Sequence, residues 1–505
     1  MLSPIGVAVC VIFIFLLIFL YFHRNREIYK LASQFHGPLS LPIIGCLYLF
    51  LGNSESIYRR ILKFYETFPS PFRVWLGPRL VITVFTPDEA KAILQSRKTI
   101  EKDESYRLFK PWLGEGLFTA RADIWRVHRK LIQPTFNQRI LNSFVEIFQK
   151  NSVILNEEFE KIVNGEEFTI LNYLSNTLLS IILESSMGLK LDNKGSSRRK
   201  FMEAVEQIIK TVSTRGFKIW LQSDFIFKLT RLSKEFAENI KYVHSITENI
   251  IETKRKTITT VKEAETSDEF IKMRKPFLDL LMTLSQEGKT FTNIELRDEV
   301  TTLLVAGYDT TALSLSFVIL MLASHPQIQD KAYQEIYDIY GTTDPDEVPV
   351  TCKDLPKLVY LDRVIKETMR LFPVSAIIVR TSEENFELGK YIIPKGSAIV
   401  IGISRIHRDE KFWPEPLKFD PDRFLPEQIA KRHQYSYLPF SGGLRNCIGE
   451  MYAMMMMKTI ISVILRKYIL KKDNIQRMED IRLKFDIFLQ PVEPIKIRLE
   501  NRIVK

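Results

Sequence analysis

Residues 439–449 of this 505-residue sequence read Pro439-Phe440-Ser441-Gly442-Gly443-Leu444-Arg445-Asn446-Cys447-Ile448-Gly449, and a strongly helical stretch follows from Glu450 to about Tyr468. A cysteine placed just before a helix meets free backbone amides and the positive end of the helix dipole, which both favour its thiolate. The thiolate is the form that binds metals. The stretch therefore predicts a ligand-binding cysteine or, as the alternative, a structural cysteine in a glycine-rich turn.

Neighbouring residues indicate what kind of ligand Cys447 would hold. Gly442 and Gly443 permit a tight turn, and Gly449 lets the backbone approach a ligand closely. Arg445 presents a guanidinium fork that suits a carboxylate. A planar ligand that carries both a metal ion and carboxylates would use all of these features.

The spacing Phe-x-x-Gly-x-Arg-x-Cys-x-Gly resembles in full the haem-binding signature of the cytochrome P450 superfamily, and its residues here are Phe440, Gly443, Arg445, Cys447 and Gly449. Five such positions would match by chance with a probability on the order of one in ten thousand. The resemblance implies a mainly α fold with small β-sheets, a haem b cofactor, and Cys447 as the axial ligand of the iron. In this family the thiolate pushes electron density toward dioxygen and favours O–O cleavage.

Two further motifs of that family occur in the right order. Glu367-Thr368-Met369-Arg370 matches its Glu-x-x-Arg pattern, which places two opposite charges on one helix face. Residues 419–424 resemble the segment whose arginine, here Arg423, completes a Glu–Arg–Arg network, although the family usually has Glu where Asp422 stands. The resemblance gives Glu367, Arg370 and Arg423 a structural role beneath the haem.

The resemblance also implies which residues hold the haem propionates. Trp125-Arg126-Val127-His128-Arg129 matches a Trp-x-x-x-Arg motif whose two ends contact a propionate. Arg380 stands where the family has another propionate partner, and Arg445 is a third cation for this role. The expected cofactor-binding residues are Trp125, Arg129, Ala306, Gly307, Arg380, Phe440, Arg445, Cys447 and Gly449.

One long helix is predicted from Thr292 to the His325-Pro326 pair. Thr292-Asn293-Ile294-Glu295 is a capping box, in which the threonine and the glutamate satisfy the first free amides. About 33 residues give a length of about 50 Å, enough to cross a domain of this size. Such a helix should be buried, yet its centre reads Ala306-Gly307-Tyr308-Asp309-Thr310-Thr311. Taken alone, these threonines could bond to carbonyls one turn earlier, and Asp309 could meet a basic partner.

The resemblance gives this central stretch a catalytic interpretation, because it is similar to the oxygen-activation motif of the family. Gly307 would leave room for dioxygen, Thr310 would hydrogen-bond the oxygen species, and Asp309 would relay protons from solvent. The chain as a whole looks most like the animal family-4 clan with its many insect members. Some fatty-acid hydroxylases of that clan carry a glutamate that esterifies the haem. Since Ala306 stands at that position, we expect a non-covalent haem.

The first 50 residues read as a membrane anchor and a linker. No charged residue occurs between Leu2 and Phe22, and a stretch of that length spans the hydrocarbon core of a bilayer. Basic residues follow it, which predicts a cytosolic body, and the resemblance to microsomal members of the family implies the endoplasmic reticulum membrane. A cleaved signal peptide is the alternative. We expect an anchor at 1–23, a basic and proline-rich linker and hinge at 24–50, and a haem-thiolate monooxygenase domain at 51–505.

The body should be one mainly helical domain. Short strands are predicted at 79–85 and 398–403, and a charged loop at about 257–276. The cysteines Cys10, Cys46, Cys352 and Cys447 show no paired spacing, so neither a disulfide framework nor a zinc site is expected.

Lysine and arginine total 71 against 60 acidic residues, a net charge of +11. No nucleic-acid-binding motif accompanies this excess. By the resemblance it should serve the membrane surface and an acidic electron donor, either NADPH-cytochrome P450 reductase or cytochrome b5. The basic residues expected at that docking face are Arg126, His128, Lys130, Lys458, Arg466, Lys467, Lys471 and Lys472.

The resemblance predicts a monooxygenase that inserts one oxygen atom from O2 into a lipophilic substrate such as a fatty acid, hormone, odorant or xenobiotic. The alternative is a haem-thiolate isomerase or dehydratase that rearranges peroxides without a reductase, which would have little use for Asp309 and Thr310. A haem-based gas sensor or electron carrier is a third possibility. By family analogy the substrate pocket should be lined by residues 106–118, 201–227, those just before Ala306, 374–379 and 485–488.

Overall fold

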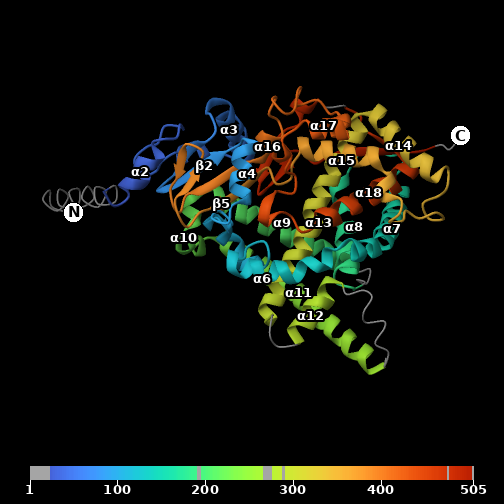
Figure 1. The fold of residues 1–505 in the computed structure, drawn as a ribbon. Helices are drawn as coiled ribbons and strands as arrows, with labels where there is room; N and C mark the ends of the chain where they lie inside the picture. The colour runs from blue at the N-terminus through green and yellow to red at the C-terminus, as the bar shows by residue number, and fades with distance from the viewer. Residues whose placement is uncertain (1–22, 190–194, 265–275, 287–290, 475–476, 503–505) are drawn as a thin grey trace.

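The structure is a computed structural model that describes residues 23–189, 195–264, 276–286, 291–474 and 477–502. Helices make up most of it, and the largest sheet lies toward the end where the N-terminus emerges (Figure 1). The expected fold class, mainly α with small β-sheets, is confirmed. The anchor predicted at 1–23 falls almost wholly outside the described residues.

The largest sheet is mixed and has the strand order β1-β2-β8-β5-β3. Its strands are β1 (Phe72–Leu76), β2 (Arg79–Val84), β8 (Ala398–Gly402), β5 (Ile377–Thr381) and β3 (Glu101–Lys102). Both strands predicted from the sequence are in this sheet, as β2 and β8, and they pair in parallel although more than 300 residues separate them along the chain. The other pairs are antiparallel. This sheet carries Lys102 and Arg380 toward the site described below.

Three smaller sheets complete the β-structure of the described residues. They comprise β4 (Phe168–Thr169), β12 (Lys496–Asn501) and β9 (Tyr468–Lys471); β10 (Leu483–Asp486) and β11 (Phe488–Pro491); and β6 (Phe386–Leu388) and β7 (Tyr391–Ile393). The turn between β10 and β11 reaches the central cavity through Ile487 and Phe488.

The helices form a bundle around the longest buried one. In chain order they are α2 (Arg26–Ala32), α3 (Ser54–Thr67), α4 (Pro87–Gln95), α5 (Lys110–Leu113), α6 (Ala122–Ile132), α7 (Gln138–Glu160), α8 (Ile170–Ser185), α9 (Gly195–Phe217), α10 (Asp224–Lys228), α11 (Arg231–Ala264), α12 (Phe277–Gln286), α13 (Asn293–Ser324), α14 (Pro326–Tyr340), α15 (Val359–Leu371), α16 (Ile403–Ile406), α17 (Pro426–Ala430) and α18 (Glu450–Lys467).

Helix α13 is the centre of the fold and has the bounds expected from the sequence. Thr292 and Glu295 form the predicted capping box: Thr292 Oγ1 accepts from the Glu295 amide at 3.2 Å, and Glu295 Oε2 accepts from the Thr292 amide at 2.8 Å. The helix packs against α8, α11, α15 and α18 (Figure 1). In the described part of the chain it is the helix long and apolar enough to cross a membrane, but here it is buried in the protein core.

The predicted linker is packed onto the domain over part of its length. Ala32, Phe35 and Cys46 are buried in the same core as the large sheet. The amide of Cys46 donates to the Trp75 carbonyl at 2.6 Å, and the amide of Arg73 donates to the His36 carbonyl at 2.7 Å. Hydrogen bonds and burial thus fix residues near Ala32–His36 and Cys46 to the domain, whereas Leu39 and Ile43 between them are exposed, and the predicted boundary at residue 50 stays a prediction.

The loop predicted at about 257–276 is also shorter than expected. Helix α11 continues to Ala264, since its 34 residues contain no proline or glycine that would end it earlier. Residues 265–275 lie outside the described part of the chain.

Candidate active site

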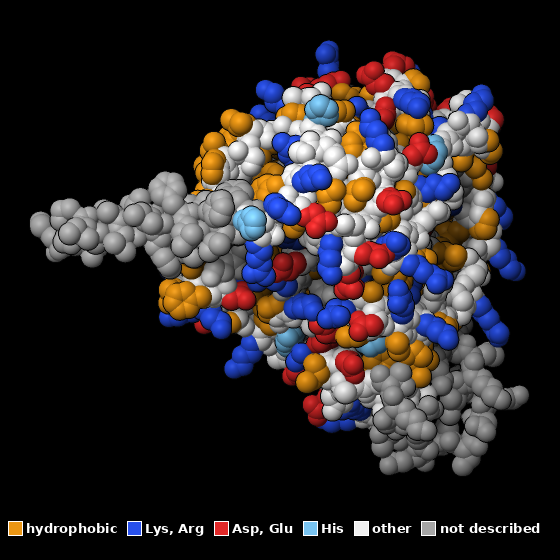
Figure 2. Space-filling model, turned by 60° about the vertical axis from the view of Figure 1, so that its left-hand side comes forward, with side chains coloured by type: hydrophobic (Ala, Val, Ile, Leu, Met, Phe, Trp, Pro, Cys, Tyr) orange, Lys and Arg blue, Asp and Glu red, His pale blue; other side chains and the backbone are white. Residues whose placement is uncertain are grey.

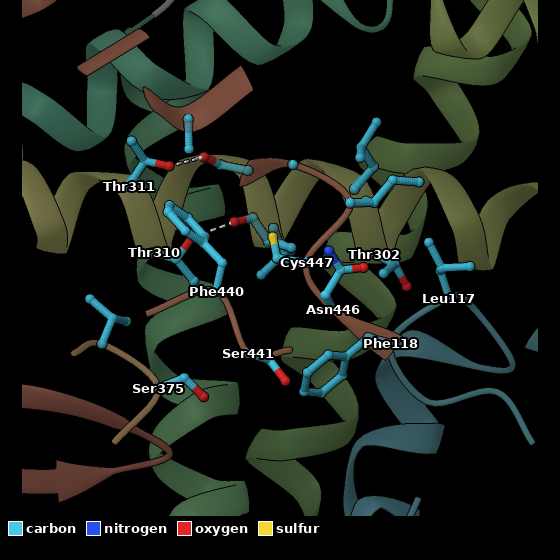
Figure 3. A pocket seen from close by; sticks show the side chains of 18 of the residues that line it. Leu117, Phe118, Thr302, Thr310, Thr311, Ser375, Phe440, Ser441, Asn446 and Cys447 are labelled. Atoms are coloured by element: carbon cyan, nitrogen blue, oxygen red, sulfur yellow. Dashed lines mark hydrogen bonds between the residues drawn. The ribbon is translucent and has the colours of Figure 1, made fainter. Parts of the chain in front are cut away.

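A central cavity of about 340 Å³ separates α13 from the loop before α18. On the α13 side it is lined by Thr302, Ala306, Gly307 and Thr310, and Cys447 lies on the opposite wall. Figure 3 shows the loop segment with Phe440, Asn446 and Cys447 crossing this part of α13. Residues far apart in the sequence thus face one space.

The loop around Cys447 is held by its own backbone. The Cys447 amide donates to the Phe440 carbonyl at 2.9 Å and closes the turn. Gly443 has φ of +69°, and a Cβ there would overlap the carbonyl oxygen of Leu94, so only glycine fits. Gly442 is extended and needs no unusual φ. The predicted tight turn therefore depends on Gly443, the glycine of the signature.

The Cys447 side chain is exposed, and that exposed surface belongs to the cavity lining. The surrounding protein nevertheless desolvates the thiol, so burial raises its pKa above the usual value, and the Glu450 carboxylate acts in the same direction. The amides of Gly449 and Glu450 and the Arg129 guanidinium lower it less. The amides at the start of the helix thus favour the thiolate, as expected from the sequence, but burial has the larger effect on the pKa.

A group of cations lies along one side of the cavity. Arg445 donates to the carbonyl oxygens of Ala120 at 2.8 Å and Ile100 at 3.3 Å, and its guanidinium lies 4.9 Å from the Trp125 ring. Arg129 donates to the Asn446 carbonyl at 2.9 Å, next to Cys447. The structure thus brings the predicted propionate partners Trp125, Arg129, Arg380 and Arg445 to one cavity.

Sequence reasoning missed a further cation, Lys102. In the register of β3 and β5 it stands directly opposite Arg380, and like charges in that position repel each other. Burial lowers the Lys102 pKa well below its usual value, and the charges of Arg380 and Arg445 lower it further. Burial and the Arg380 charge lower the pKa of Arg445 to about 10. Lys102 lies in a two-residue strand that no sequence pattern marked.

Whether the chain can hold a dicarboxylate cofactor depends on whether these cations have other negatively charged partners. Among the described residues, no carboxylate forms an ion pair with Lys102, Arg129, Arg380 or Arg445. Clustered buried charges of one sign are costly unless an opposite charge joins them. A ligand with two carboxylates would supply that charge, and Cys447 would supply a ligand for its metal. The residues present fit haem b.

Comparisons with known proteins agree with this geometry. The family profile "Cytochrome P450" matches residues 35–499. The chain belongs to the cytochrome P450 family. Cytochrome P450 4c3 of Drosophila melanogaster is 33% identical over 504 residues, which cover 97% of this chain and 93% of that relative.

Two more relatives of this cytochrome P450 have similar coverage. Cytochrome P450 4c21 of Blattella germanica is 34% identical and covers 97% of each chain, and cytochrome P450 4V2 of Homo sapiens is 32% identical over 91% of this chain and 88% of the human one. The family-4 clan suggested by the sequence is confirmed. The crystal structure of the cytochrome P450DA heme domain shares the fold, with a TM-score of 0.77 at 20% identity over 93% of this chain and 98% of that one. The protein is therefore a haem-dependent monooxygenase of the P450 type.

Helix α13 of this P450 carries the predicted oxygen-activation residues near its centre. Thr310 Oγ1 donates to the Ala306 carbonyl at 2.7 Å, and Ala306 is exposed to the cavity. A Cβ on Gly307 would come within 2.6 Å of Ile182 Cδ1, so this glycine is needed for the close approach of α8. Burial raises the pKa of Asp309 to about 7, with a contribution from the charge of Glu206 on α9. No basic partner for Asp309 is among the described ion pairs.

The Glu-x-x-Arg pair on α15, Glu367 and Arg370, is fully buried. Arg370 forms a bidentate ion pair with Glu367 at 2.7 and 2.8 Å and also donates to the carbonyls of His407, Pro416 and Lys418. Arg423 Nε lies 3.4 Å from Glu367 Oε1, so the three-residue network expected from the sequence is formed. Asp422 pairs instead with Arg363 at 2.8 Å.

Several basic residues predicted to dock an electron donor have other roles. His128 is buried and lies 2.7 Å from Glu299 Oε1, and Arg466 is largely buried and donates to the carbonyls of Val348 and Thr343. Lys458, Lys467 and Lys472 are mostly covered and form ion pairs with Asp362, Glu160 and Glu167. The docking prediction is wrong for His128 and Arg466. Arg126 and Lys130 on α6 are exposed, so for them docking of an electron donor stays a prediction.

Each of the five segments expected to line a substrate pocket contributes to the cavity. They supply Tyr106, Phe109, Leu113, Leu117 and Phe118; Ile209; Leu303 and Val305; Val374, Ser375 and Ile378; and Ile487 and Phe488. Most of these side chains are apolar, so the part of the cavity beyond the haem position suits a lipophilic molecule.

Proposed function

We propose that this cytochrome P450 inserts one oxygen atom from O2 into a lipophilic substrate, with electrons that NADPH-cytochrome P450 reductase delivers from NADPH. The observation that carries the proposal is the cavity itself, with Cys447 on one wall and Asp309 and Thr310 on the helix opposite. Haem b, when bound, supplies oxygen activation. Cys447 would be its axial ligand, and Lys102, Arg129, Arg380 and Arg445 would hold its carboxylates.

The distal residues can manage the protons that this reaction consumes. Because the Thr310 hydroxyl donates its hydrogen to the Ala306 carbonyl, its oxygen is left to accept a hydrogen bond from a group in the cavity. A carboxyl with a pKa of about 7 is half protonated at neutral pH, so Asp309 can take up protons and release them again. Glu206 on α9 is exposed to solvent, and its charge is close enough to Asp309 to raise the pKa of that carboxyl.

Our first prediction is that NADPH oxidation in the presence of reductase yields stoichiometric oxygenated product, and that Asp309→Asn lowers the product rate by about a hundredfold. In wild type this rate should fall above about pH 7, because the Asp309 carboxyl then loses the proton it donates. The asparagine variant should lack that decline. The assay compares NADPH loss with product formation between pH 6 and pH 9 (approximate limits).

The same assay separates the main proposal from its alternative. A haem-thiolate isomerase or dehydratase would convert a hydroperoxide without NADPH or reductase and would tolerate Asp309→Asn. Product formation under those conditions, with no NADPH-dependent reaction, would replace the monooxygenase by the isomerase. An electron carrier or gas sensor would give no product in either case.

We also expect the haem to be held without a covalent bond. Ala306 has no carboxyl that could form an ester, and it faces the cavity one turn before Thr310. In our second prediction, denaturation of the holoprotein in acid and extraction with an organic solvent removes all haem from the polypeptide. Haem absorbance that migrates with the chain in a denaturing gel would contradict this expectation.

We further propose that the enzyme lies on the endoplasmic reticulum membrane with its catalytic domain in the cytosol. Exposed apolar side chains occur in the proline-rich segment and around α10, both near the end where the N-terminus emerges: Leu39, Ile43, Leu51, Trp220, Phe225 and Leu229. Figure 2 shows hydrophobic side chains gathered beside the N-terminal segment at that end. Such a patch fits a lipid surface better than water.

A further inference from the structure

Two hydroxyls that line the cavity, that of Ser441 in the cysteine loop and that of Thr302 on α13, have no hydrogen-bond partner among the described residues. Thr302 is 7% exposed and lines the cavity, and its Oγ1 is a buried atom without a hydrogen bond among the described residues. Its neighbours on α13 behave differently, because Thr301, Thr310 and Thr311 each donate to the carbonyl four residues earlier at 2.7–3.0 Å. An unsatisfied buried hydroxyl costs stability and calls for a physical explanation.

The loop before α6 is shaped around this hydroxyl. A Cβ on Gly116 would overlap Thr302 Oγ1, and Gly116 does not have a positive φ, so glycine is present here for space. Neighbouring loop amides are already used: that of Glu115 donates to Asp298 at 3.1 Å and that of Leu117 to Glu299 at 3.1 Å. The loop therefore packs against Thr302 without giving it a hydrogen bond, and the hydroxyl remains available to a ligand.

Helix geometry relates Thr302 to the reacting position. Residues 302, 306 and 310 are spaced by four and share one face of α13, and all three line the cavity. Eight residues correspond to about 12 Å along the helix axis. A ligand bonded to Thr302 would thus present a site about 12 Å away to Thr310. Apolar side chains, among them Leu117, Phe118 and Val305, line the same cavity.

From this geometry we propose that Thr302 is a specificity-determining residue, which selects substrates with a neutral hydrogen-bond acceptor at one end of an apolar chain. Charge decides against a carboxylate in this place. Asp298 and Glu299 precede Thr302 by one turn and already pair with Arg297, at 2.9 Å, and with His128, at 2.7 Å. A ligand carboxylate bonded to Thr302 would lose its hydration without gaining either of these partners, whereas an ester, ketone or ether oxygen would accept the hydrogen bond at a lower desolvation cost. The inference rests on the proposed function and names its substrate class.

The test compares three ligands with the same chain: methyl dodecanoate, dodecane and dodecanoate. Binding to the holoenzyme is measured calorimetrically and by the spin-state change of the haem, without turnover. Wild type should bind the ester more tightly than dodecane or dodecanoate. Thr302→Val keeps the shape and removes the hydroxyl, so it should weaken ester binding by about three- to tenfold and leave dodecane binding unchanged. Thr302→Ser should restore it.

Equal effects of Thr302→Val on the ester and on dodecane would show that the residue only packs, and would overturn the proposal. Tightest binding of dodecanoate to wild type would overturn it too. The comparison of the three ligands on wild type remains decisive even if the valine variant fails to fold. Failure of the proposed function would look different, because product formation with reductase would then be absent while these binding differences persisted.

Discussion

Replacing Cys447 by serine is expected to remove monooxygenase activity, by about a thousandfold or more, and to abolish the red-shifted Soret band of the reduced carbon monoxide complex. That band reports a thiolate bound to the haem iron. Cys447 is the cysteine that lines the central cavity, and the turn that presents it is closed by its own amide. A serine hydroxyl fits this turn but is a much poorer electron donor to the metal. A thousandfold loss corresponds to about 4 kcal/mol of activation free energy.

Cys352→Ser is the matched control, because Cys352 is a free, partly buried cysteine that does not line the cavity. It should retain both the band and the activity. Haem content is measured for both variants by extraction, so that loss of the cofactor is distinguished from a changed ligand. A wild-type spectrum without the red-shifted band, or a Cys447→Ser variant that keeps it, would contradict the assignment of Cys447 as the ligand.

The second large effect is expected from Arg370→Leu. Both partners of the Glu367–Arg370 pair are 0% exposed, so removal of the arginine leaves a buried carboxylate that keeps only Arg423 and the Asp420 amide among its described partners, and it frees three carbonyls. Breaking a buried ion pair on one side costs about 3–5 kcal/mol. The variant should show a much lower unfolding midpoint and a low haem content.

Two further variants serve as controls for Arg370→Leu. Replacing Glu367 and Arg370 together by leucine should be less harmful than Arg370→Leu alone, since no unpaired charge stays buried. Glu158→Ala breaks an exposed pair with Lys161 that has the same i,i+3 spacing, and it should leave the midpoint unchanged. A midpoint of Arg370→Leu close to that of wild type would show that the network does not support the fold.

Parts of this protein could be predicted because their cause is local. The capping box of Thr292 and Glu295 marks the start of α13, and His325-Pro326 marks its end, since both act through adjacent backbone groups. The turn at Gly443 could be expected for the same reason. Helix α11, by contrast, continues to Ala264 although a loop is predicted from about residue 257. The high charge of this stretch is typical of a loop, but it contains no proline or glycine that would end the helix.

Side chains that depend on distant segments were predicted less well. His128 and Arg466 look like surface cations in the sequence, but both are buried in the structure. His128 pairs with Glu299, and Arg466 donates to the carbonyls of Val348 and Thr343. Lys102 could not be predicted as a cavity cation, because it is placed beside Arg380 by a strand pairing across almost 280 residues. Thr302 resembles its neighbours in sequence, and only the approach of Gly116 sets it apart.

The sequence by itself determined the family and the central helix and predicted the metal ligand and the apolar character of the pocket, because each is carried by residue types at short spacing. The tertiary structure decided which cations meet, how the pKa values of Cys447 and Asp309 shift, and which cavity hydroxyls lack a partner among the described residues. The physical reason is that desolvation and charge interactions depend on distance in space. Such distances exist only once the sheet, α13 and the cysteine loop have packed around one cavity.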